Sequence, residues 1–173
     1  LFPIWVESKK RDYLLEKLSN NVKKTDTILI APTGIDGFPE LTIINKLEKI
    51  IEKLLSKTNF HIILRPHPRD RRYEKYLYLE SKFVKNQRFS YDISENYFDT
   101  YSKSKLMITD LSGTAFTFAF LILSPVIFLS TDEKKIEEHE YSSYNFFLDR
   151  KKIGEVIFDE GELINKIESI IKN

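Results

Sequence analysis

Hydroxyl and glycine residues follow a short apolar run near the middle of the chain, in the order Asp110-Leu111-Ser112-Gly113-Thr114. The apolar run 106–109 is typical of a buried strand, and the Phe-, Ala- and Leu-rich run after Thr114 is typical of a buried helix. A turn between such elements presents backbone N–H groups without helical partners, and these can bind an anion. Asp110 or Ser112 could cap the helix, and Gly113 lets a ligand approach the backbone. The turn predicts a phosphate site, although an ordinary capped helix has the same pattern.

A histidine between two prolines follows another apolar run, in Arg65-Pro66-His67-Pro68-Arg69. The prolines favour a rigid, extended backbone at the end of a strand. A neutral histidine can donate a hydrogen bond to a phosphate oxygen, and a guanidinium binds phosphate through a fork of N–H groups. This segment therefore predicts phosphate binding by Arg65, His67 and Arg69. The alternative is that the prolines only end the strand and the charges are solvated.

Several other kinds of site are disfavoured. No G-x-G-x-x-G fingerprint and no Walker-type loop follows an apolar run, which disfavours NAD-linked chemistry and P-loop ATP hydrolysis. The absence of cysteine excludes disulfides and thiolate metal sites and favours a reducing compartment. His61 lies in an apolar run and His139 among glutamates, so we assign both to structural or surface roles and expect no metal site. The 27 basic and 26 acidic residues nearly balance, so the net charge does not indicate binding to nucleic acid.

Six apolar runs alternate with helical patterns, and this alternation predicts how the loops are positioned. The runs predict buried strands at 27–31, 60–64, 89–91, 106–109, 125–129 and 155–158. The clearest helical pattern begins at Pro39 and Glu40 and has an apolar stripe that ends at Leu55. We expect an α/β fold with a doubly wound, mostly parallel, six-stranded Rossmann-like sheet and helices on both faces. Ligands bind such sheets at the carboxyl ends of the strands, where the loops 32–37, 65–69 and 110–114 should lie.

The length of 173 residues fits a single domain with a substantial core. We expect an N-terminal helical segment at 1–26 and one Rossmann-like lobe at 27–173. The longest apolar run, 115–129, has 15 residues and polar or proline interruptions, so it is short for a membrane-spanning helix. The sole methionine is Met107, and we therefore expect the chain to be a piece of a longer protein.

Three segments together resemble the C-terminal, nucleotide-binding lobe of CDP-glycerol glycerophosphotransferase-like enzymes, which build teichoic-acid and capsule-type polymers. Residues 28–33 are similar to the first strand of that lobe and its Ala-Pro-Thr loop, and residues 64–68 to its His-Pro motif. The strongest block of the family is matched by Phe98-Asp99-Thr100-Tyr101 and residues 106–116, ending in Ser124-Pro125-Val126-Ile127. The likeness covers residues 28–129, most of the chain.

The resemblance implies the two-lobed B-type glycosyltransferase fold, in which the C-terminal lobe holds most of the donor. By position, His67 would contact the donor diphosphate and stabilise the leaving group. Ser112, Thr114 and the amide of Gly113 would hold phosphate at the helix N-terminus. The remaining residues of the predicted donor site are the phosphate-binding Arg65, Arg69 and Asp110 and the nucleotide loop Pro32, Thr33 and Gly34.

The chain departs from the family pattern at one point. The family commonly has two adjacent serines in this turn, whereas Gly113 separates Ser112 from Thr114 here, which leaves the donor open. Bacterial polysialyltransferases, which use a CMP-linked sugar, share the His-Pro and hydroxyl-pair motifs. UDP-N-acetylglucosamine 2-epimerases have a similar turn followed by two glutamates. Thr117 and Phe118 stand near those places, which counts against epimerase chemistry.

The resemblance implies transfer of glycerol-phosphate or a similar polyol-phosphate from a cytidine nucleotide donor to a polymer or lipid-linked acceptor. The CDP-linked donor is a substrate, so no cofactor is expected. The general base is expected on an N-terminal lobe missing from this chain, and the chain alone should bind a donor without turning it over. Two alternatives stay open: a capsule-type glycosyltransferase that uses a CMP- or UDP-linked sugar, and a non-catalytic Rossmann-like scaffold or interaction domain.

The resemblance also implies a cellular place and a set of partners. We expect a cytoplasmic protein at the inner face of a bacterial plasma membrane, with peripheral membrane association through parts outside this chain. No nucleic-acid partner is expected.

Overall fold

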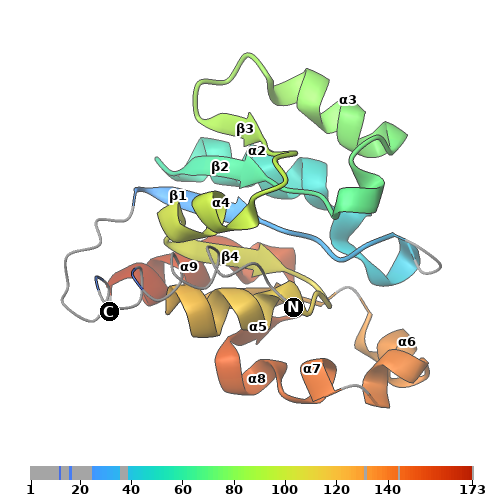
Figure 1. The fold of residues 1–173 in the computed structure, drawn as a ribbon. Coiled ribbons are helices and arrows are strands. Elements are labelled where there is room, and N and C mark those ends of the chain that lie inside the picture. The colour runs from blue at the N-terminus through green and yellow to red at the C-terminus, as the bar shows by residue number, and fades with distance from the viewer. Residues whose placement is uncertain are drawn as a thin grey trace.

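A parallel sheet forms the centre of the molecule. The computed structural model describes residues 12, 16, 25–35, 39–130, 132–143 and 145–172. Its six strands run parallel in the order β3-β2-β1-β4-β5-β6 (Figure 1). The strands are β1 (Thr27–Ile30), β2 (His61–Leu64), β3 (Phe89–Tyr91), β4 (Leu106–Thr109), β5 (Val126–Leu129) and β6 (Glu155–Ile157). Each lies within one residue of its predicted bounds, and the predicted doubly wound sheet is confirmed.

Helices and short helical turns connect the strands. The helices are α2 (Leu47–Lys57), α3 (Glu74–Phe83), α4 (Tyr97–Lys103), α5 (Thr114–Thr117), α6 (Glu133–Glu137), α7 (Asn145–Leu148), α8 (Arg150–Ile153) and α9 (Leu163–Lys172). The π-helix η4 (Phe118–Ile122) continues α5. Five 3-10 turns complete the described elements: η1 (Pro39–Leu41), η2 (Ile43–Asn45), η3 (Pro68–Asp70), η5 (Glu140–Ser143) and η6 (Glu160–Glu162). Most of the predicted helical segment 1–26 lies outside the described residues.

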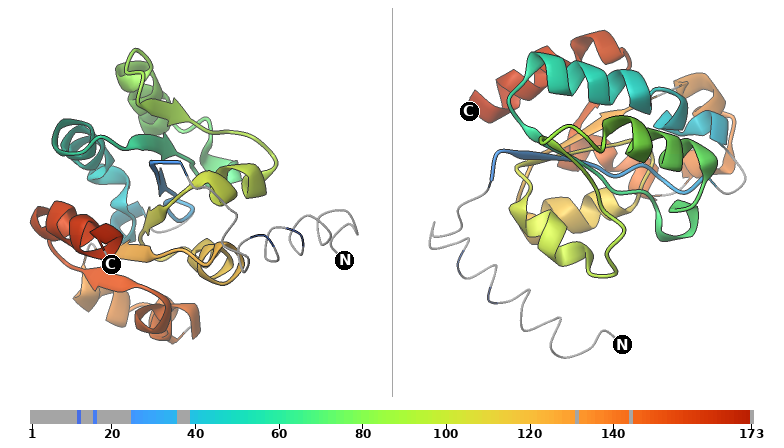
Figure 2. Two further views of the ribbon diagram at one scale, coloured as in Figure 1. Left: turned by 90° about the vertical axis from the view of Figure 1, so that its left-hand side faces the viewer. Right: turned by 90° about the horizontal axis from the view of Figure 1, so that it is seen from above.

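Two apolar cores cover the two faces of the sheet. On one face, α2, α3 and α9 pack against alternate residues of the strands, such as Ile28 and Ile30 of β1. On the other face, α4, α5 and η4 pack against Leu29 of β1 and Met107 of β4. Figure 2 shows these two helical layers on opposite sides of the sheet. Because β1, β4 and β5 are buried on both faces, their sequences are continuous apolar runs rather than alternating ones.

One helix begins later than its apolar periodicity predicts. Two separate 3-10 turns replace the expected helical start at Pro39, and α2 begins only at Leu47. The backbone N–H of Ile43 donates to the Asp110 carboxylate across 2.9 Å, and the Thr42 side chain accepts from the N–H of Ile44. These amides are satisfied by side chains instead of helical carbonyls, so the chain is held in short turns.

The strand order creates a crevice at the centre of the sheet. Strands β1 and β4 are neighbours, and the strand order reverses between them. The connection after β1 leads to one side of the sheet and the connection after β4 to the other. In open α/β sheets this switch point, at the carboxyl ends of the strands, is where ligands bind. In Figure 1 these strand ends face the right-hand side.

Candidate functional site

The loops after β1, β2 and β4 meet in a single cleft of about 560 Å³ at the carboxyl ends of the strands. Its lining residues are Thr33, Gly34, Arg65, His67, Pro68, Arg69, Glu95, Tyr97, Tyr101, Ser112, Gly113, Thr114 and Thr117. Pro32 lines a smaller adjoining hollow of about 70 Å³, together with His67, Ser112 and Thr114. The structure therefore brings together all the predicted site residues except Asp110.

Two buried carboxylates fix the loops relative to one another. Asp110 accepts a hydrogen bond from the backbone N–H of Thr33 at 2.7 Å and another from Ile43 at 2.9 Å. Asp70, at the end of η3, accepts from the backbone N–H of Ile35 at 2.9 Å. The loop after β1 is thus tied to the loop after β4 by Asp110 and to the loop after β2 by Asp70.

The placement of Asp110 differs from its predicted contact with phosphate. The residue is 2% exposed, and its carboxylate also accepts from the N–H of Leu111 at 2.8 Å. Burial raises the pKa of Asp110, and the hydrogen bonds from Ile43, Thr33 and Leu111 act in the opposite direction. The carboxylate lies behind the turn and outside the cleft lining, so Asp110 positions the loops instead of facing a ligand.

The His67 imidazole lines the cleft and caps η3. Its Nδ1 accepts a hydrogen bond from the backbone N–H of Arg69 at 3.4 Å, which starts η3. In a neutral ring with Nδ1 as acceptor, the hydrogen is on Nε2, which can donate to an anion. A Cβ added to Gly34 would lie 3.4 Å from His67 Cγ and 3.5 Å from Nδ1. The loop after β1 therefore packs closely against this ring.

The Arg65 guanidinium is largely occupied by the protein itself, in contrast to its predicted role. The residue is 8% exposed, and its Nη1 pairs with the Asp92 carboxylate at 2.6 Å. Its Nη1 and Nη2 also donate to the hydroxyl and carbonyl oxygens of Ser94, at 3.1 and 2.8 Å. Arg65 lines the cleft, but its hydrogen bonds hold the loop after β3 against the end of β2.

The hydroxyl turn lies between β4 and α5 as predicted, but the N-cap of α5 is Gly113, which has no side chain to cap the helix, where Asp110 or Ser112 was expected. The Ser112 hydroxyl accepts from the backbone N–H of Thr114 at 3.4 Å, and the Ser112 carbonyl accepts from Ala115 at 3.2 Å. The Thr114 hydroxyl pairs with the hydroxyl of the buried Tyr101. Gly113 is exposed, and an added Cβ there would meet no atom within 4 Å. The backbone of this turn therefore stays open to the cleft side.

Sequence reasoning missed the contribution of the loop after β3 and of α4 to the cleft. Glu95, Tyr97 and Tyr101 come from this part of the chain, and Thr117 comes from the first turn of α5. Strand β3 lies at the edge of the sheet, and the Arg65–Asp92 ion pair connects the loop after it to the end of β2. The sequence contained one indication of this contribution, the block Phe98-Asp99-Thr100-Tyr101. It carries part of the family resemblance, but no residue of it was predicted to belong to the site.

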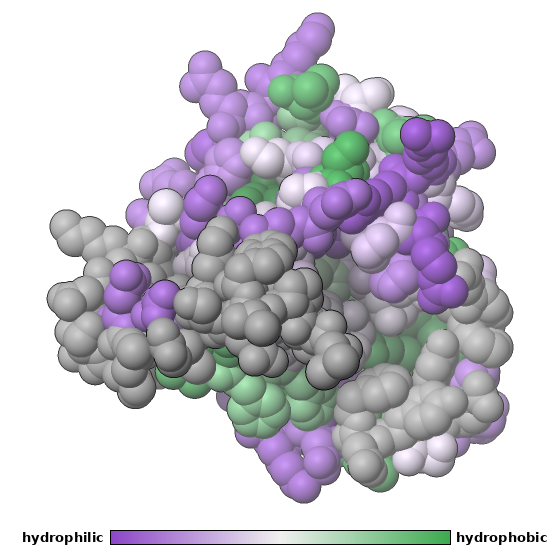
Figure 3. Space-filling view, in the orientation of Figure 1, coloured by the Kyte–Doolittle hydropathy of each residue, from purple (hydrophilic) through white to green (hydrophobic). Residues whose placement is uncertain are grey.

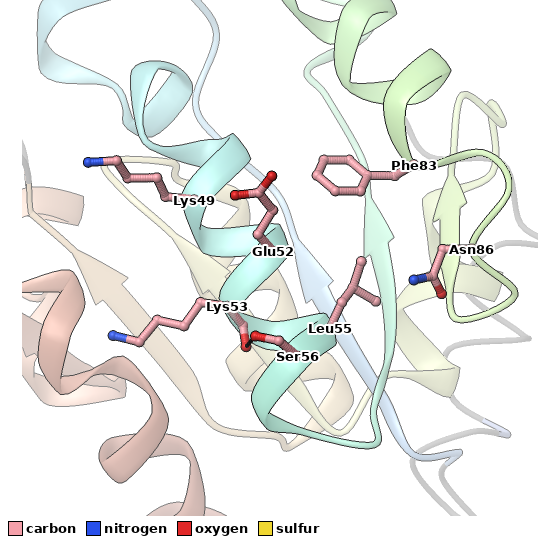
Figure 4. Close-up of a pocket in the computed structure, with 7 residues that line it drawn as sticks. All are labelled: Lys49, Glu52, Lys53, Leu55, Ser56, Phe83 and Asn86. Carbon is pink, nitrogen blue, oxygen red and sulfur yellow. Dashed lines mark hydrogen bonds between the residues drawn. The ribbon is translucent and has the colours of Figure 1, made fainter.

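A second hollow, of about 680 Å³, lies between α2 and the end of α3. Figure 4 shows its residues: Lys49, Glu52, Lys53, Leu55 and Ser56 on α2, with Phe83 and Asn86 opposite. The ends of α2 and α3 lead into the amino ends of β2 and β3, so this hollow lies at the other edge of the sheet. Doubly wound sheets bind ligands at the carboxyl ends, which favours the cleft around His67.

Within the described residues, no three His, Asp or Glu side chains gather in a way that could hold a metal ion. The same part of the chain contains no helix that is both long and apolar enough to cross a membrane.

The fold and the site define an α/β protein with a ligand cleft at the switch point of a parallel sheet. Residues 5–173 match the family model described as CDP-Glycerol:Poly(glycerophosphate) glycerophosphotransferase. The chain belongs to this family. The family is associated with polymer synthesis of the teichoic-acid type. The family resemblance expected from the three sequence segments is thereby confirmed.

Individual proteins are similar to the chain in sequence or in fold. The chain is 28% identical, over 133 residues, to the minor teichoic acid biosynthesis protein GgaB of Bacillus subtilis (strain 168). Its fold is similar to the wall teichoic acid polymerase TagF, with a TM-score of 0.59 and 17% identity over 94% of this chain. It is also similar to the UDP-GlcNAc 2-epimerase of Methanocaldococcus jannaschii, with a TM-score of 0.58 and 17% identity over 92% of this chain. At these identities the two structures show the shared fold alone.

The chain spans only part of each of these proteins. It covers 13% of GgaB, 39% of TagF and 43% of the epimerase.

Proposed function

We propose that this chain is the donor-binding lobe of a glycerophosphotransferase. In this account, a CDP-linked donor binds in the cleft, and its glycerol-phosphate or a similar polyol-phosphate passes to a growing cell-surface polymer. The observation that carries the proposal is that His67, Arg69 and the Ser112–Thr114 turn line one cleft at the switch point. Membership of the glycerophosphotransferase family supports the choice of donor.

The cleft offers an anion both cationic groups and directed hydrogen-bond donors. His67 and Arg69, after β2, belong to the lining together with the hydroxyl turn after β4. The backbone of Gly113 is exposed at the start of the helix formed by α5 and η4, where an anion can approach it closely. The next three N–H groups, from Thr114 to Phe116, already bond to oxygens of Ser112 and Gly113. A diphosphate bridging these two sides would be bound by both loops.

The chemical role of the lobe in this proposal is to stabilise the departing nucleotide. The acceptor hydroxyl attacks the phosphorus that carries the polyol and gives its proton to the general base. The bond from that phosphorus to the bridging oxygen breaks, and CMP leaves with negative charge on its phosphate, where preorganised donors lower the energy of the developing charge. No covalent intermediate on the protein is required. The general base is assigned to a part of the longer protein outside this chain, so the 173-residue chain should bind a donor without turning it over.

The proposed cellular place follows from the same reaction. We assign this step to the cytoplasmic face of the plasma membrane, with membrane contacts made by parts outside this chain.

Calorimetric titration of the chain with CDP-glycerol, CDP-ribitol, CMP, UDP-N-acetylglucosamine and NAD tests the proposal. We expect selective binding of cytidine nucleotides, weakened about tenfold by His67→Ala because a charge-assisted hydrogen bond to phosphate is lost. The matched control is His61→Ala: this half-buried histidine of β2 bonds to the Ser90 hydroxyl at 2.7 Å, away from the cleft.

Each other result of this titration has a definite meaning. A preference for UDP-N-acetylglucosamine moves the assignment to a sugar transferase. Binding that His61→Ala weakens as much as His67→Ala contradicts the proposed site. If no nucleotide binds, the chain is not a donor-binding lobe by itself, and a scaffold role gains support.

A further inference from the structure

We propose a second anion site beside the cleft, formed by Arg71 and Arg72, which binds a phosphodiester of the polymer acceptor. These two residues are called the basic rim. The choice of ligand rests on the proposed function, because that reaction extends a chain of phosphodiesters. The sequence supplies the starting point: Asp70 separates the predicted phosphate-binding segment 65–69 from two further arginines that the donor site does not use.

Arg71 is held in a fixed place by contacts at both of its ends. Its Nη2 donates to the carbonyl of Ser94 at 3.1 Å. Its own carbonyl accepts a hydrogen bond from the Tyr91 hydroxyl at 2.7 Å. Burial raises the pKa of Tyr91 to about 12, so this hydroxyl stays protonated and remains a donor. Arg71 is therefore a preorganised cation instead of a freely moving surface side chain.

The charge of the basic rim is not balanced by the described part of the protein. Arg65 pairs with Asp92, but neither Arg71 nor Arg72 forms an ion pair with a described residue. The neighbouring Asp70 carboxylate is buried and accepts from the N–H of Ile35. The half-buried Arg71 also has a buried Nε without a hydrogen-bond partner. A positioned guanidinium without a carboxylate is a suitable partner for a phosphate group.

The basic rim adjoins the cleft instead of lying on a remote surface. The carbonyl of Ser94 accepts from Arg65 at 2.8 Å and from Arg71 at 3.1 Å, which brings the two guanidinium groups together. The next residue, Glu95, lines the cleft. In Figure 3, hydrophilic side chains gather over η3 and the start of α3, where this segment lies.

The extent of the positive charge favours a chain of phosphates over a single nucleotide. The cationic residues of the cleft are sufficient to bind a nucleoside diphosphate. The basic rim adds two positive charges outside the cleft. A polymer with one phosphodiester per unit could contact both regions at once. The fixed, half-buried state of Arg71 favours a discrete phosphodiester over a membrane surface, which long exposed side chains usually contact.

Calorimetric titration with a short synthetic glycerol-phosphate oligomer, with and without saturating CDP-glycerol, tests the site. The variant is Arg71→Gln/Arg72→Gln, and its control is Lys57→Gln/Lys85→Gln. The control removes two exposed charges next to the amino ends of β2 and β3, at the other edge of the sheet. We expect the rim variant to lower the affinity for the oligomer at least about tenfold and to leave CDP-glycerol binding unchanged, while the control changes neither. Thermal melting verifies that each variant is folded.

Several outcomes would overturn the basic rim. These are no binding of the oligomer, an affinity that the rim variant leaves unchanged, an equal loss in the control, or complete displacement of the oligomer by CDP-glycerol. The rim variant could instead weaken co-sedimentation with phosphatidylglycerol vesicles and leave the affinity for the soluble oligomer unchanged. That result would assign the two arginines to membrane binding. The experiment distinguishes failure of the proposed function from failure of the basic rim. If CDP-glycerol does not bind but the oligomer binds through Arg71 and Arg72, the donor site is contradicted and the basic rim is supported.

Discussion

Charged residues at the cleft divide into those that build the site and those left for a ligand. Asp110 and Asp70 bind backbone N–H groups, and Arg65 binds Asp92 and Ser94. Sequence reasoning assigned Arg65 and Asp110 to phosphate because their types and positions suit it, yet long-range partners use their hydrogen-bonding capacity. His67, with its Nε2–H directed by the bond at Nδ1, keeps a donor for an anion.

Asp110→Asn should destabilise the protein without changing the shape of the side chain. The carboxylate accepts hydrogen bonds from three backbone N–H groups with two oxygens, whereas the amide has one acceptor oxygen. The NH2 group of the amide therefore faces a backbone N–H, and that N–H loses its hydrogen bond. We expect a loss of about 2 kcal/mol in the free energy of unfolding, measured by urea titration. The exposed Asp99→Asn is the control and should change it by less than about 0.5 kcal/mol. Equal effects of the two would contradict a structural role for Asp110.

Asp92 should give the stability a defined pH dependence. Burial raises the pKa of Asp92, but hydrogen bonds from Thr100, Ser94 and Arg65 outweigh it and hold the pKa below its usual value. A lowered folded-state pKa stabilises the protein above the unfolded-state value of about 3.9, and this stabilisation is lost as the pH falls through the folded-state pKa.

The measurement compares the unfolding free energies of the natural chain and Asp92→Asn between neutral and acidic pH. The difference should be about 2 kcal/mol at neutral pH and should shrink below about pH 4. Asp26→Asn, whose side chain is 72% exposed, is the control and should change the stability little at any pH. A difference for Asp92 that stays constant with pH would rule out the Arg65–Asp92 pair as its cause.

At the scale of elements, the periodicity of the sequence predicts the strands and most helices, but not how the helices begin and end. The start of α2 depends on the bond from Ile43 to Asp110, which are 67 residues apart in sequence. The helix after the hydroxyl turn changes from α5 to the π-helix η4, and it ends at Leu123. Contacts between distant segments decide these boundaries, so local patterns do not contain them.

The end of η4 carries strain that a substitution should release. Leu123 has φ 52° and ψ 49°, which is the left-handed conformation. This conformation is unfavourable for most residues with a Cβ atom, and glycine and asparagine adopt it most readily. Its side chain is 46% exposed, so little packing is lost on replacement. Leu123→Gly should therefore raise the free energy of unfolding by about 0.5–1 kcal/mol, measured by urea titration. Leu121→Gly, inside η4, should lower it by about 1 kcal/mol or more. A loss at Leu123 similar to that at Leu121 would contradict this account.

At the scale of the whole molecule, the alternation of apolar runs and helical patterns predicts the fold class and the edge of the sheet that binds ligands. It does not predict the strand order β3-β2-β1-β4-β5-β6, because pairing between strands depends on contacts that local sequence does not encode. The same limit applies to the cleft. Its central residues follow apolar runs and are visible in the sequence, whereas Glu95, Tyr97 and Tyr101 join it through long-range contacts. These include the Arg65–Asp92 pair and the bond between the Tyr101 and Thr114 hydroxyls.

Chemical-shift mapping of the isotope-labelled chain during titration with CDP tests the central claim most directly, because it locates the bound anion. The account predicts that the largest backbone amide shifts occur at Thr33, Gly34, His67, Gly113 and Thr114, at the carboxyl ends of the strands. The largest shifts in the hollow between α2 and α3, around Lys49 and Lys53, would contradict it. An unchanged spectrum would also contradict the claim that this chain alone holds the donor.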